Sequence, residues 1–407
     1  MKGRETKPVV VVGAGPVGAV TALALYRREV PVVLIEAEAA PVKDQRAAST
    51  QPPTIEMLAA LGLEARMRER GLVSTSFRFF DRISGARIAE FDCGLLKDDT
   101  PYPFVLQHEQ FKLVDTILKL VAGTPGFTVR FSTRHVGHEQ SGSGVAVFVE
   151  TPDGRETIEA SYLIGCDGGH SSVRHAAEIA FEGFTFPEKF IKIGTTFDFQ
   201  SAHPDYVYRN YFSDPEEWCN LFKVRGDGPP GIWRCVFPCR VGESDEAALS
   251  PEGCEARLHK FFPGFRDFEI AYRSIYSVSQ RVAATFRAGR VCLAGDAAHV
   301  NNPIGGLGMN GGIHDAVNLA EKLAGVWHGS ADDDVLDLYT RQRRRAQHEF
   351  VQEQTIRNKR ELEAKDPAVR TRNLDALRRL CDDPIGARAY LRRATLIDSV
   401  ETVAAVA

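Results

Sequence analysis

The stretch VVVVGAGPVGAV, from Val9 to Val20, decides the fold of this 407-residue chain. Its four consecutive valines form a short apolar run, which predicts a strand buried on both faces in a parallel sheet. Gly13, Gly15 and Gly18 then follow the spacing G-x-G-x-x-G, and the alanine-rich segment 19–28 is expected to be a helix. This order of strand, glycine turn and helix predicts a loop that binds the phosphates of a dinucleotide.

The next segment indicates which dinucleotide binds. PVVLIEA (31–37) predicts a second strand with Glu36 at its end, 18 residues after Gly18. In such a unit the first glycine allows a tight turn, the second lets the backbone approach a pyrophosphate, and the third lets the helix pack closely on the strand. A carboxylate at position 36 can accept hydrogen bonds from a ribose diol and would repel a 2′-phosphate, so FAD or NAD is favoured over NADP.

A second motif follows in the middle of the chain, in SYLIGCDGGHSSVR (161–174). YLIGC predicts a short buried strand, and Asp167 begins a turn that contains two glycines. Ser171 and Ser172 are able to cap the helix that follows, because serine oxygens accept hydrogen bonds from the first backbone amides of a helix.

A third motif lies in residues 289–324. RVCLAGD predicts another buried strand, ending at Asp296, and a glycine-rich loop leads into a long helix that begins near Met309 and Asn310. A plain NAD-dependent dehydrogenase has the first motif without this late one, so the combination favours FAD.

With these three motifs in this order, the chain resembles the FAD-dependent group A aromatic hydroxylases, of the phenol and hydroxyphenylpropionate hydroxylase kind. GAGPVG, CDGGHSSVR and GDAAHVNNPIGGLGMN carry the resemblance, which covers about residues 8–330. Longer relatives have a C-terminal thioredoxin-like domain, and the short form is expected here. The resemblance implies an α/β fold, in which a Rossmann-type FAD-binding domain carries an inserted, mainly antiparallel β-sheet substrate domain and C-terminal helices.

The domain boundaries are predicted from the same pattern. Aromatic-rich runs, among them FIKIGTTFDF, DYVYRNYF, WCNLFKV and GIWRCVFP, predict an antiparallel sheet that forms a roof over the flavin. The last segment reads as charged helices with a solvated face. We expect a discontinuous FAD domain at 1–75, 105–185 and 285–330, a substrate domain at 76–104 and 186–284, and a helical region at 331–407.

The resemblance also implies which residues bind the cofactor. The glycine loop holds the pyrophosphate, and Glu36 binds the adenosine ribose. Arg46 lies near the flavin and its phosphates, and Gln107 contacts the FAD chain. Asp167 supports FAD and the transient nicotinamide nucleotide, and Asp296 binds the ribityl chain. The backbone of 308–310 faces the flavin, where a helix N-terminus stabilises the negative charge of the reduced ring. The full set is Gly13, Gly15, Pro16, Val17, Gly18, Glu36, Arg46, Gln107, Asp167, Gly295, Asp296, Pro303, Gly308, Met309 and Asn310.

The implied reaction uses tightly, non-covalently bound FAD, NADH or NADPH as a transient co-substrate, and O2. A flavin 4a-hydroperoxide then hydroxylates a phenolic or other electron-rich ring. Pro303 borders the reacting oxygen, although many relatives have two prolines where this chain has Asn302-Pro303. Arg234 and Tyr211 match substrate-contacting positions. Arg234 is equally well read as a surface arginine of an alternating strand, and Tyr211 as a sheet-packing residue.

The histidines of the chain are not expected to be catalytic. His299 is expected to fix the glycine-rich loop rather than to act as a base. His135 and His138 are expected at the surface, and His314 is expected to be structural.

Three other functions share the fold and stay open: a quinone-ring hydroxylase, a flavin reductase and a non-catalytic FAD-binding regulatory protein. A halogenase is discounted, because WRCVFP lacks the W-x-W-x-I-P motif.

Composition excludes further classes. The formal net charge of −4 gives no basic surface for nucleic acid, no run of about 18 apolar residues predicts a membrane span, and the N-terminus lacks a signal-peptide pattern. The eight cysteines contain no C-x-x-C pair, so no metal site is predicted, and free thiols fit the cytoplasm. We expect a cytoplasmic protein, as a homodimer, whose partner is a small aromatic substrate.

Overall fold

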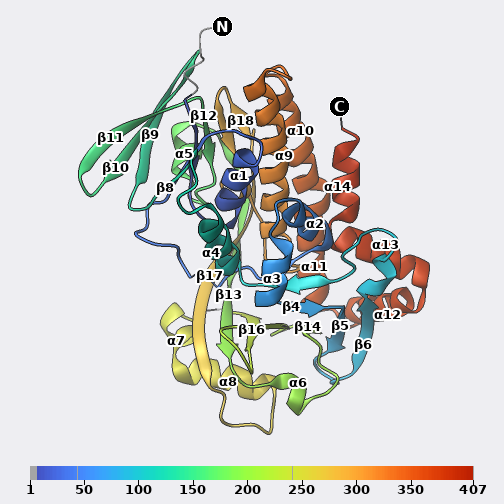
Figure 1. The fold of residues 1–407 in the computed structure, drawn as a ribbon. Coiled ribbons are helices and arrows are strands. Elements are labelled where there is room, and N and C mark those ends of the chain that lie inside the picture. The colour runs from blue at the N-terminus through green and yellow to red at the C-terminus, as the bar shows by residue number, and fades with distance from the viewer. Residues whose placement is uncertain (1–6, 44, 241, 407) are drawn as a thin grey trace.

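The computed structural model describes residues 7–43, 45–240 and 242–406, and Figure 1 shows an upper and a lower half that are each built on a sheet. The upper sheet has the order β18-β19-β12-β1-β2-β8. Its neighbouring strands are parallel except for β18 and β19. The carboxyl ends of the parallel strands therefore meet at one edge. The strands are β1 (Val9–Val12), β2 (Val32–Ile35), β8 (Phe127–Arg130), β12 (Tyr162–Gly165), β18 (Arg287–Ala288) and β19 (Val291–Leu293).

Two helices, α1 (Pro16–Tyr26) and α9 (Gly308–His328), pack against each other beside this sheet (Figure 1). A Cβ atom on Gly312 would lie 2.5 Å from Cγ2 of Val17, so glycine allows the close approach of the two helices. The expected helix 19–28 begins earlier, because Pro16 occupies the first turn, where its fixed φ suits a helix start.

Smaller elements surround the upper sheet. An antiparallel sheet of β9 (Arg134–Ser141), β10 (Gly144–Thr151) and β11 (Gly154–Ala160) lies beside β12, and β3 (Ser49–Thr50), β7 (Val105–Gln107) and β4 (Leu72–Ser74) form another. The remaining helices here are α2 (Pro52–Ala60), α3 (Glu64–Arg70), α4 (Gln110–Val121) and α5 (Ser172–Ala176).

The expectation that His135 lies at the surface is wrong. Only 5% of this residue is exposed, because α5 packs on β9 and covers it. Its Nδ1 lies 2.9 Å from the Ser172 hydroxyl oxygen, and burial lowers its pKa to about 4. His135 is therefore a neutral packing residue beside the second motif at physiological pH.

The lower sheet has the order β20-β17-β13-β16-β15-β14-β5-β6, with antiparallel neighbours except for the parallel pair β14 and β5. It is the mainly antiparallel sheet that the sequence predicts. The long strands β13 and β17 run from this sheet up into the upper half (Figure 1). The strands are β5 (Ser76–Asp81), β6 (Arg87–Asp92), β13 (Phe181–Thr195), β14 (Arg209–Ser213), β15 (Cys219–Val224), β16 (Ile232–Pro238), β17 (Ile270–Ala283) and β20 (His299–Val300).

One strand run was predicted too long. The run 190–199 leaves the sheet after Thr195, and Phe199 begins the short helix α6 (Phe199–Ala202). The Phe199 ring packs edge-on against Trp233 and Phe262 beneath the sheet, so burial of the aromatic ring overrides its strand preference.

The two faces of the lower sheet have different partners. Leu221, Trp233 and Phe237 face outward, into a core shared with α7 (Asp245–Leu249) and α8 (Pro251–Phe261). Residues that pair directly across neighbouring strands share a face. Because Arg234 opposes Phe222, Phe222 opposes Arg209, and Tyr211 opposes Asn220, the register gathers these side chains on the other, inner face: Arg209, Tyr211, Asn220, Phe222 and Arg234.

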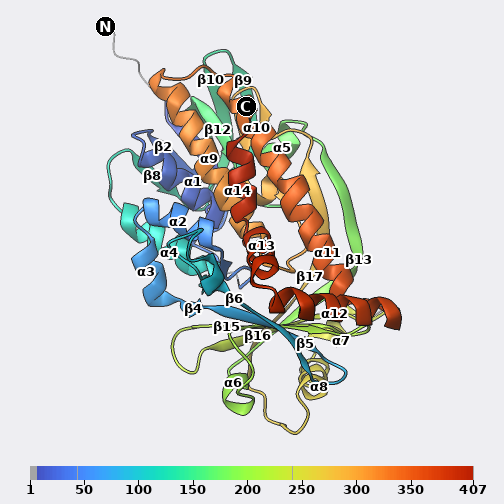
Figure 2. The ribbon, with the colours of Figure 1, turned by 90° about the vertical axis from the view of Figure 1, so that its right-hand side faces the viewer.

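The C-terminal helices pack against the lower sheet, in addition to having a charged face. In Figure 2, α12 (Pro367–Asp382) lies across the end of the lower sheet near β5 and β6. Leu374 of α12 and Leu391 of α13 (Pro384–Ala394) are buried in the inner-face core. Asp99, whose side chain is 3% exposed, pairs with Arg388 and Arg392 of α13. The other elements are α10 (Val335–Ala346), a π-helical turn (Gln347–Gln352), α11 (Glu353–Leu362) and α14 (Ile397–Ala404).

Across the three described segments, none of the helices combines the length and apolar character that a membrane crossing needs.

The buried histidine of α9 predicts a pH dependence of stability. His314 is 1% exposed, its Nε2 lies 2.8 Å from the Thr54 hydroxyl oxygen, and burial together with the nearby charge of Arg343 lowers its pKa to about 3. Protonation therefore favours the unfolded chain. The contribution of His314 is fully present above about pH 6.5 and decreases by about 1.4 kcal/mol per pH unit as the pH falls toward 3.

We expect His314→Gln to reduce the loss of unfolding free energy between pH 7.5 and pH 5 by about 2 kcal/mol. Urea unfolding with saturating FAD measures this difference, and the values at pH 7.5 give the cost of the substitution itself. An equal loss in both proteins would contradict the assignment.

Candidate active site

The glycine loop lies at the carboxyl edge of the upper sheet, between β1 and α1. Gly13 has φ +96°, and a Cβ atom there would lie 2.6 Å from the Cys166 carbonyl oxygen. A Cβ atom on Gly18 would lie 1.9 Å from the Gly13 carbonyl oxygen. A Cβ atom on Gly15 would meet no described atom within 4 Å. Gly13 and Gly18 therefore shape the loop, whereas Gly15 leaves open space where a ligand can approach the backbone.

The helix that follows this loop starts without a side-chain cap: Gly15 is the N-cap and Pro16 the first helical residue. Glu36, at the end of β2, accepts hydrogen bonds from the amides of Ala14 (2.7 Å) and Glu38 (3.0 Å). Its carboxylate thus lies against the glycine loop, as a group that binds the ribose next to a pyrophosphate would.

In the second motif, the Asp167 carboxylate binds the residues at the start of α5. Asp167 accepts hydrogen bonds from the Ser171 hydroxyl (2.5 Å) and from the amide and hydroxyl of Ser172 (2.7 and 2.9 Å). Ser171 in turn caps α5 by accepting from the Arg174 amide, as expected. The carboxylate of Asp167 positions the turn at the cofactor edge, and a direct contact with FAD stays a prediction.

The third motif depends on Asp315, a residue of α9 that the sequence analysis missed. Its Oδ2 lies 2.5 Å from His299 Nε2 and accepts from the Gly295 amide (3.1 Å), while Oδ1 accepts from Arg343 Nε (2.7 Å). The Asp315 and His299 side chains are fully buried. Burial alone would raise the pKa of Asp315, but the charges of His299 and Arg343 lower it. His299 therefore fixes the loop, as predicted, and Asp296 is half-buried beside this network.

The glycine-rich loop before α9 is held from several sides. Asn310 accepts from the Gln51 amide (2.8 Å) and donates to the carbonyls of Gly306 (2.7 Å) and Ser49 (2.9 Å). Pro303 is exposed on the loop, and α9 starts at Gly308 without a side-chain cap. The first amides of α9 are therefore free for a negatively charged group, as the resemblance requires of residues 308–310.

Gln107, at the end of β7, points to a missing partner. It is fully buried, its Oε1 accepts from the Ser49 hydroxyl (2.9 Å), and its Nε2 has no hydrogen-bond partner among the described residues. A buried amide donor without an acceptor is costly, by about 1–3 kcal/mol. The flavin chain that the resemblance assigns to Gln107 would supply the acceptor.

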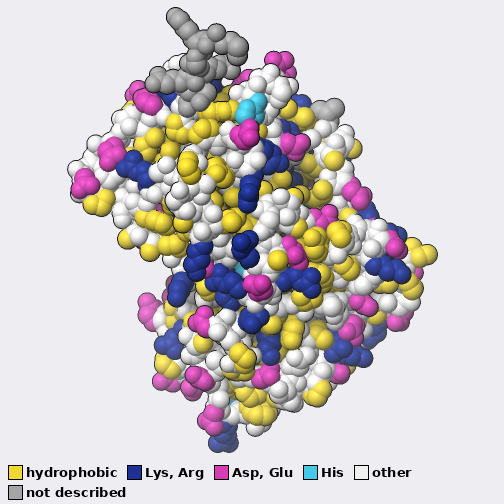
Figure 3. All heavy atoms as spheres, in the orientation of Figure 1, with side chains coloured by type: hydrophobic (Ala, Val, Ile, Leu, Met, Phe, Trp, Pro, Cys, Tyr) yellow, Lys and Arg dark blue, Asp and Glu magenta, His cyan; other side chains and the backbone are white. Residues whose placement is uncertain are grey.

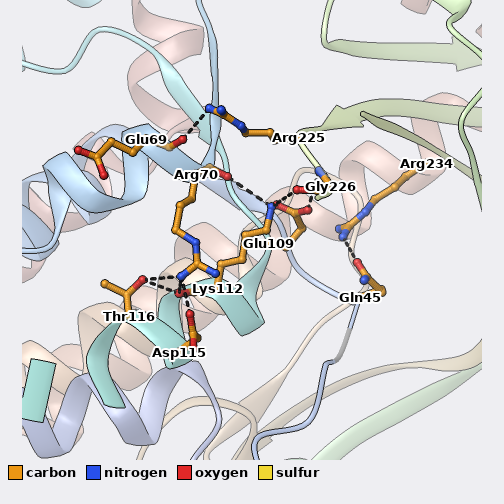
Figure 4. A network of polar contacts seen from close by, with 10 residues as sticks. All are labelled: Gln45, Glu69, Arg70, Glu109, Lys112, Asp115, Thr116, Arg225, Gly226 and Arg234. Atoms are coloured by element: carbon orange, nitrogen blue, oxygen red, sulfur yellow. Dashed lines mark hydrogen bonds and ion pairs between the residues drawn. The ribbon is translucent and has the colours of Figure 1, made fainter. Parts of the chain in front are cut away.

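Polar residues join the two halves where the predicted Arg234 lies (Figure 4). Arg234 is 3% exposed and its Nη2 donates to Gln45 Oε1 (2.6 Å), while Lys192 donates to the Gln45 carbonyl (2.6 Å). Arg234 is thus not a surface residue. Arg46, next in the chain, is exposed on this connecting loop.

A buried ion pair clamps the β15–β16 hairpin to the upper half. Lys112 of α4 pairs with Glu109 (2.9 Å) and donates to the Gly226 carbonyl (2.6 Å), while Glu109 accepts from the Gly226 amide (3.0 Å) (Figure 4). In Figure 3, Lys and Arg side chains gather in a band across the waist of the molecule, between the two halves. Such a band attracts the phosphates of dinucleotides.

A cavity lies between the inner face of the lower sheet, the glycine-rich loop and the C-terminal helices. Tyr211 and Arg209 of β14 line it on one side, Ile304 and Gly305 of the loop on another, and α11, α12 and α13 close it. The Tyr211 ring stacks on Phe79 at 5.1 Å. The predicted Tyr211 is therefore a cavity residue as well as a packing residue, whereas Arg234 is not part of this lining.

Arg209 was not predicted, although alternation along RNYF places it on the same face as Tyr211. Gln45 and Asp315 were not predicted either, because their hydrogen-bond partners lie far away in the chain.

The residues present fit FAD. The open position at Gly15, the uncapped starts of α1 and α9, and the unpartnered Gln107 amide are features that a dinucleotide with a flavin chain would satisfy.

Comparison with known proteins agrees with this geometry. The family described as FAD binding domain matches residues 6–354. Para-nitrophenol 4-monooxygenase of Pseudomonas sp. (strain WBC-3) is 34% identical over 372 residues, which are 90% of this chain and 89% of that protein.

Two solved structures share the fold over nearly the whole chain. The crystal structure of p-nitrophenol 4-monooxygenase PnpA from Pseudomonas putida DLL-E4 is 32% identical, with a TM-score of 0.91 and 98% of each chain covered. The flavin-dependent monooxygenase PieE, solved with FAD and substrate, is 25% identical, with a TM-score of 0.80 over 98% of this chain and 72% of that chain.

The different surroundings of two glycines predict different effects of alanine. Gly15 has φ −67° and open space, so Gly15→Ala should change the unfolding free energy of the FAD-free protein by less than about 0.5 kcal/mol. It should still weaken FAD binding by about 10-fold or more, because the methyl group occupies the approach to the pyrophosphate. Gly18→Ala should lower both stability and FAD affinity. Fluorescence titration with FAD and urea unfolding separate these effects.

Gly142→Ala is the matched control, since that exposed glycine also has open space around it. FAD affinity of Gly15→Ala equal to that of the control would contradict the placement of the pyrophosphate.

Removing the charge of Asp315 should be costly. Asp315→Asn leaves Arg343 buried without its anion, and we expect the unfolding free energy to fall by about 3–5 kcal/mol. Asp337→Asn, which removes an acid of 60% side-chain exposure paired with Arg287, should cost at most about 1 kcal/mol. Equal losses in the two variants, measured by urea unfolding, would show that the buried network is not a main support of the fold.

Proposed function

Because the chain belongs to the FAD binding domain family and is an FAD-dependent aromatic monooxygenase, we propose that it hydroxylates a small phenol with NADH or NADPH and O2 as co-substrates. The observation that carries this proposal is the cavity in which Tyr211 faces the loop residues Ile304 and Gly305. That loop leads directly into the free amides at the start of α9. A ring bound in the cavity would therefore lie beside the flavin that the upper half holds.

Bound FAD supplies the redox chemistry, by taking a hydride from the nicotinamide and activating O2. The chain supplies position and charge. The glycine loop, Glu36 and Gln107 hold the cofactor, and the start of α9 stabilises negative charge on the flavin ring.

The substrate side of the proposal rests on the inner face of the lower sheet. The Tyr211 hydroxyl accepts a hydrogen bond from Arg209 (3.2 Å), so its own proton can be donated to a substrate oxygen. Ile304 and Gly305 of the glycine-rich loop, together with α11 to α13, cover the cavity and would shield a bound ring from water. Arg234 holds Gln45 next to Arg46, and we propose that it orients this connecting loop at the junction of cofactor and substrate.

The relatives suggest a class of phenol. Para-nitrophenol is the substrate named for the proteins that are 34% and 32% identical over most of the chain, so nitrophenols belong in the first panel. Cytoplasmic location and a homodimer remain predictions.

The proposal is tested by supplying the FAD-loaded protein with NADH or NADPH, O2 and a panel of phenols and hydroxylated aromatic acids. We expect at least one phenol to accelerate flavin reduction in anaerobic stopped-flow absorbance and to give a hydroxylated product once O2 is admitted. The balance is one phenol, one O2, one NAD(P)H and one proton consumed for one hydroxylated phenol, one NAD(P)⁺ and one water formed.

NAD(P)H oxidation that yields only hydrogen peroxide with every phenol would overturn the proposal and favour the flavin reductase. FAD bound without reduction by either nucleotide would favour the regulatory protein.

A further inference from the structure

Arg209 is a buried cation without an anionic partner. The residue is 4% exposed, and its guanidinium forms no ion pair with a carboxylate of the described residues. Its Nη2 donates to the Tyr211 hydroxyl, while Nε and Nη1 have no hydrogen-bond partner among the described residues. Two donor groups of a buried charge are thus left unsatisfied at the wall of the cavity.

The surroundings of Arg209 are aromatic. Its guanidinium carbon lies 5.0 Å from the centre of the Phe77 ring, and Phe79, Tyr211 and Tyr390 line the same cavity. A cation–π contact offsets only part of the cost of burying a charge, about 0.5–2 kcal/mol. The aromatic walls therefore leave most of the charge of Arg209 uncompensated and suit a flat ring as ligand.

One acidic side chain, Glu361 of α11, also lines the cavity. Burial raises its pKa, and the nearby cations that oppose this shift are Arg357 and Arg360 rather than Arg209. The other titratable neighbours of Arg209 favour their neutral forms, because burial raises the pKa of Cys93 to about 11 and that of Tyr390 above its usual range. None of these groups forms an ion pair or hydrogen bond with the Arg209 guanidinium.

We propose that Arg209 binds an anionic group of the substrate and thereby selects aromatic rings that bear an anionic oxygen. This inference rests on the proposed function. That oxygen belongs either to an ionised ring hydroxyl or to a ring carboxylate. Both accept charge-assisted hydrogen bonds from the unpartnered Nε and Nη1 of Arg209, and both cancel the charge of this buried guanidinium.

Arg234, which matches a substrate-contacting position of the resembled family, is less suited to this role. Its guanidinium already donates to Gln45 Oε1 at 2.6 Å, and it lies two strands away from β14, outside the cavity lining. We therefore assign Arg234 to holding the connecting loop and Arg209 to binding the substrate.

The inference predicts that the protein binds an anionic ligand more tightly than a neutral ligand of similar size. Two pairs of ligands test it on the FAD-loaded protein: 4-nitrophenol against 4-nitroaniline, and 4-hydroxybenzoate against 4-hydroxybenzamide, at a pH where the first member of each pair is an anion. Isothermal titration calorimetry gives each dissociation constant. We expect the protein to bind the anion of at least one pair about 10- to 100-fold more tightly than its neutral partner.

The two pairs distinguish the two sources of the anionic oxygen. Preference in the nitrophenol pair assigns the site to a phenolate, and preference in the benzoate pair assigns it to a carboxylate. The visible band of bound 4-nitrophenol reports independently whether it is held as the phenolate.

Substitutions of Arg209 test whether this residue causes the preference for the anionic ligand. Arg209→Gln should bind the charged and neutral members of each pair within about 3-fold of each other, and Arg209→Lys should keep part of the preference, because it keeps the charge without the planar fork. Arg87→Gln is the control, since Arg87 lies on β6 with 44% of its side chain exposed. This control should keep the full preference.

The absence of any charge preference in the unsubstituted protein would overturn the inference, and so would a preference that survives in a folded Arg209→Gln. The comparison of charged and neutral ligands on the unsubstituted protein tests the inference even if Arg209→Gln does not fold. No NAD(P)H is present in these titrations, so the proposed function is judged separately. Hydroxylation without charge preference overturns only the role of Arg209, and selective binding without hydroxylation overturns only the proposed function.

Discussion

The cofactor edge of this molecule depends on one buried carboxylate. Asp315 of α9 binds the Gly295 amide, His299 and Arg343. It thereby connects α9 to the segment after β19, to β20 and to α10. A carboxylate with no exposed surface is tolerated only because these groups satisfy it. The start of α9 and the loop before it are thereby held in one orientation toward the glycine loop of α1.

The lower half is fixed by a second set of contacts, which join it to the upper half. The long strands β13 and β17 connect the two sheets, and the pair Glu109 and Lys112 binds both backbone groups of Gly226 at the tip of the β15–β16 hairpin. These contacts hold the lower sheet to the upper half at this point. They lie on the same sheet as Tyr211, which lines the cavity together with the glycine-rich loop.

Much of the site was accessible from local patterns. Strand, glycine turn and helix follow from Val9–Val20, because apolar runs and glycine spacing are local signals. The start of α9 and the positioning role of His299 were predicted as well. The surface position expected for His135 was wrong, because its burial by α5 is a contact between segments far apart in the chain. The strand end at Thr195 was missed because ring packing decided it.

The sequence by itself determined the type of fold, the cofactor and the class of reaction, since these depend on residues at fixed short spacings around turns and helix starts. Only the tertiary structure decided which arginine lines the cavity between the lower sheet and the glycine-rich loop. Arg209 and Arg234 both alternate inward on their strands, and no local pattern distinguishes them. The difference arises from distant segments: the Gln45 amide oxygen accepts a hydrogen bond from Arg234, whereas Arg209 lines the cavity with two donor groups that have no partner among the described residues. Whether the donors of a buried charge are satisfied depends on what the fold brings within hydrogen-bond distance.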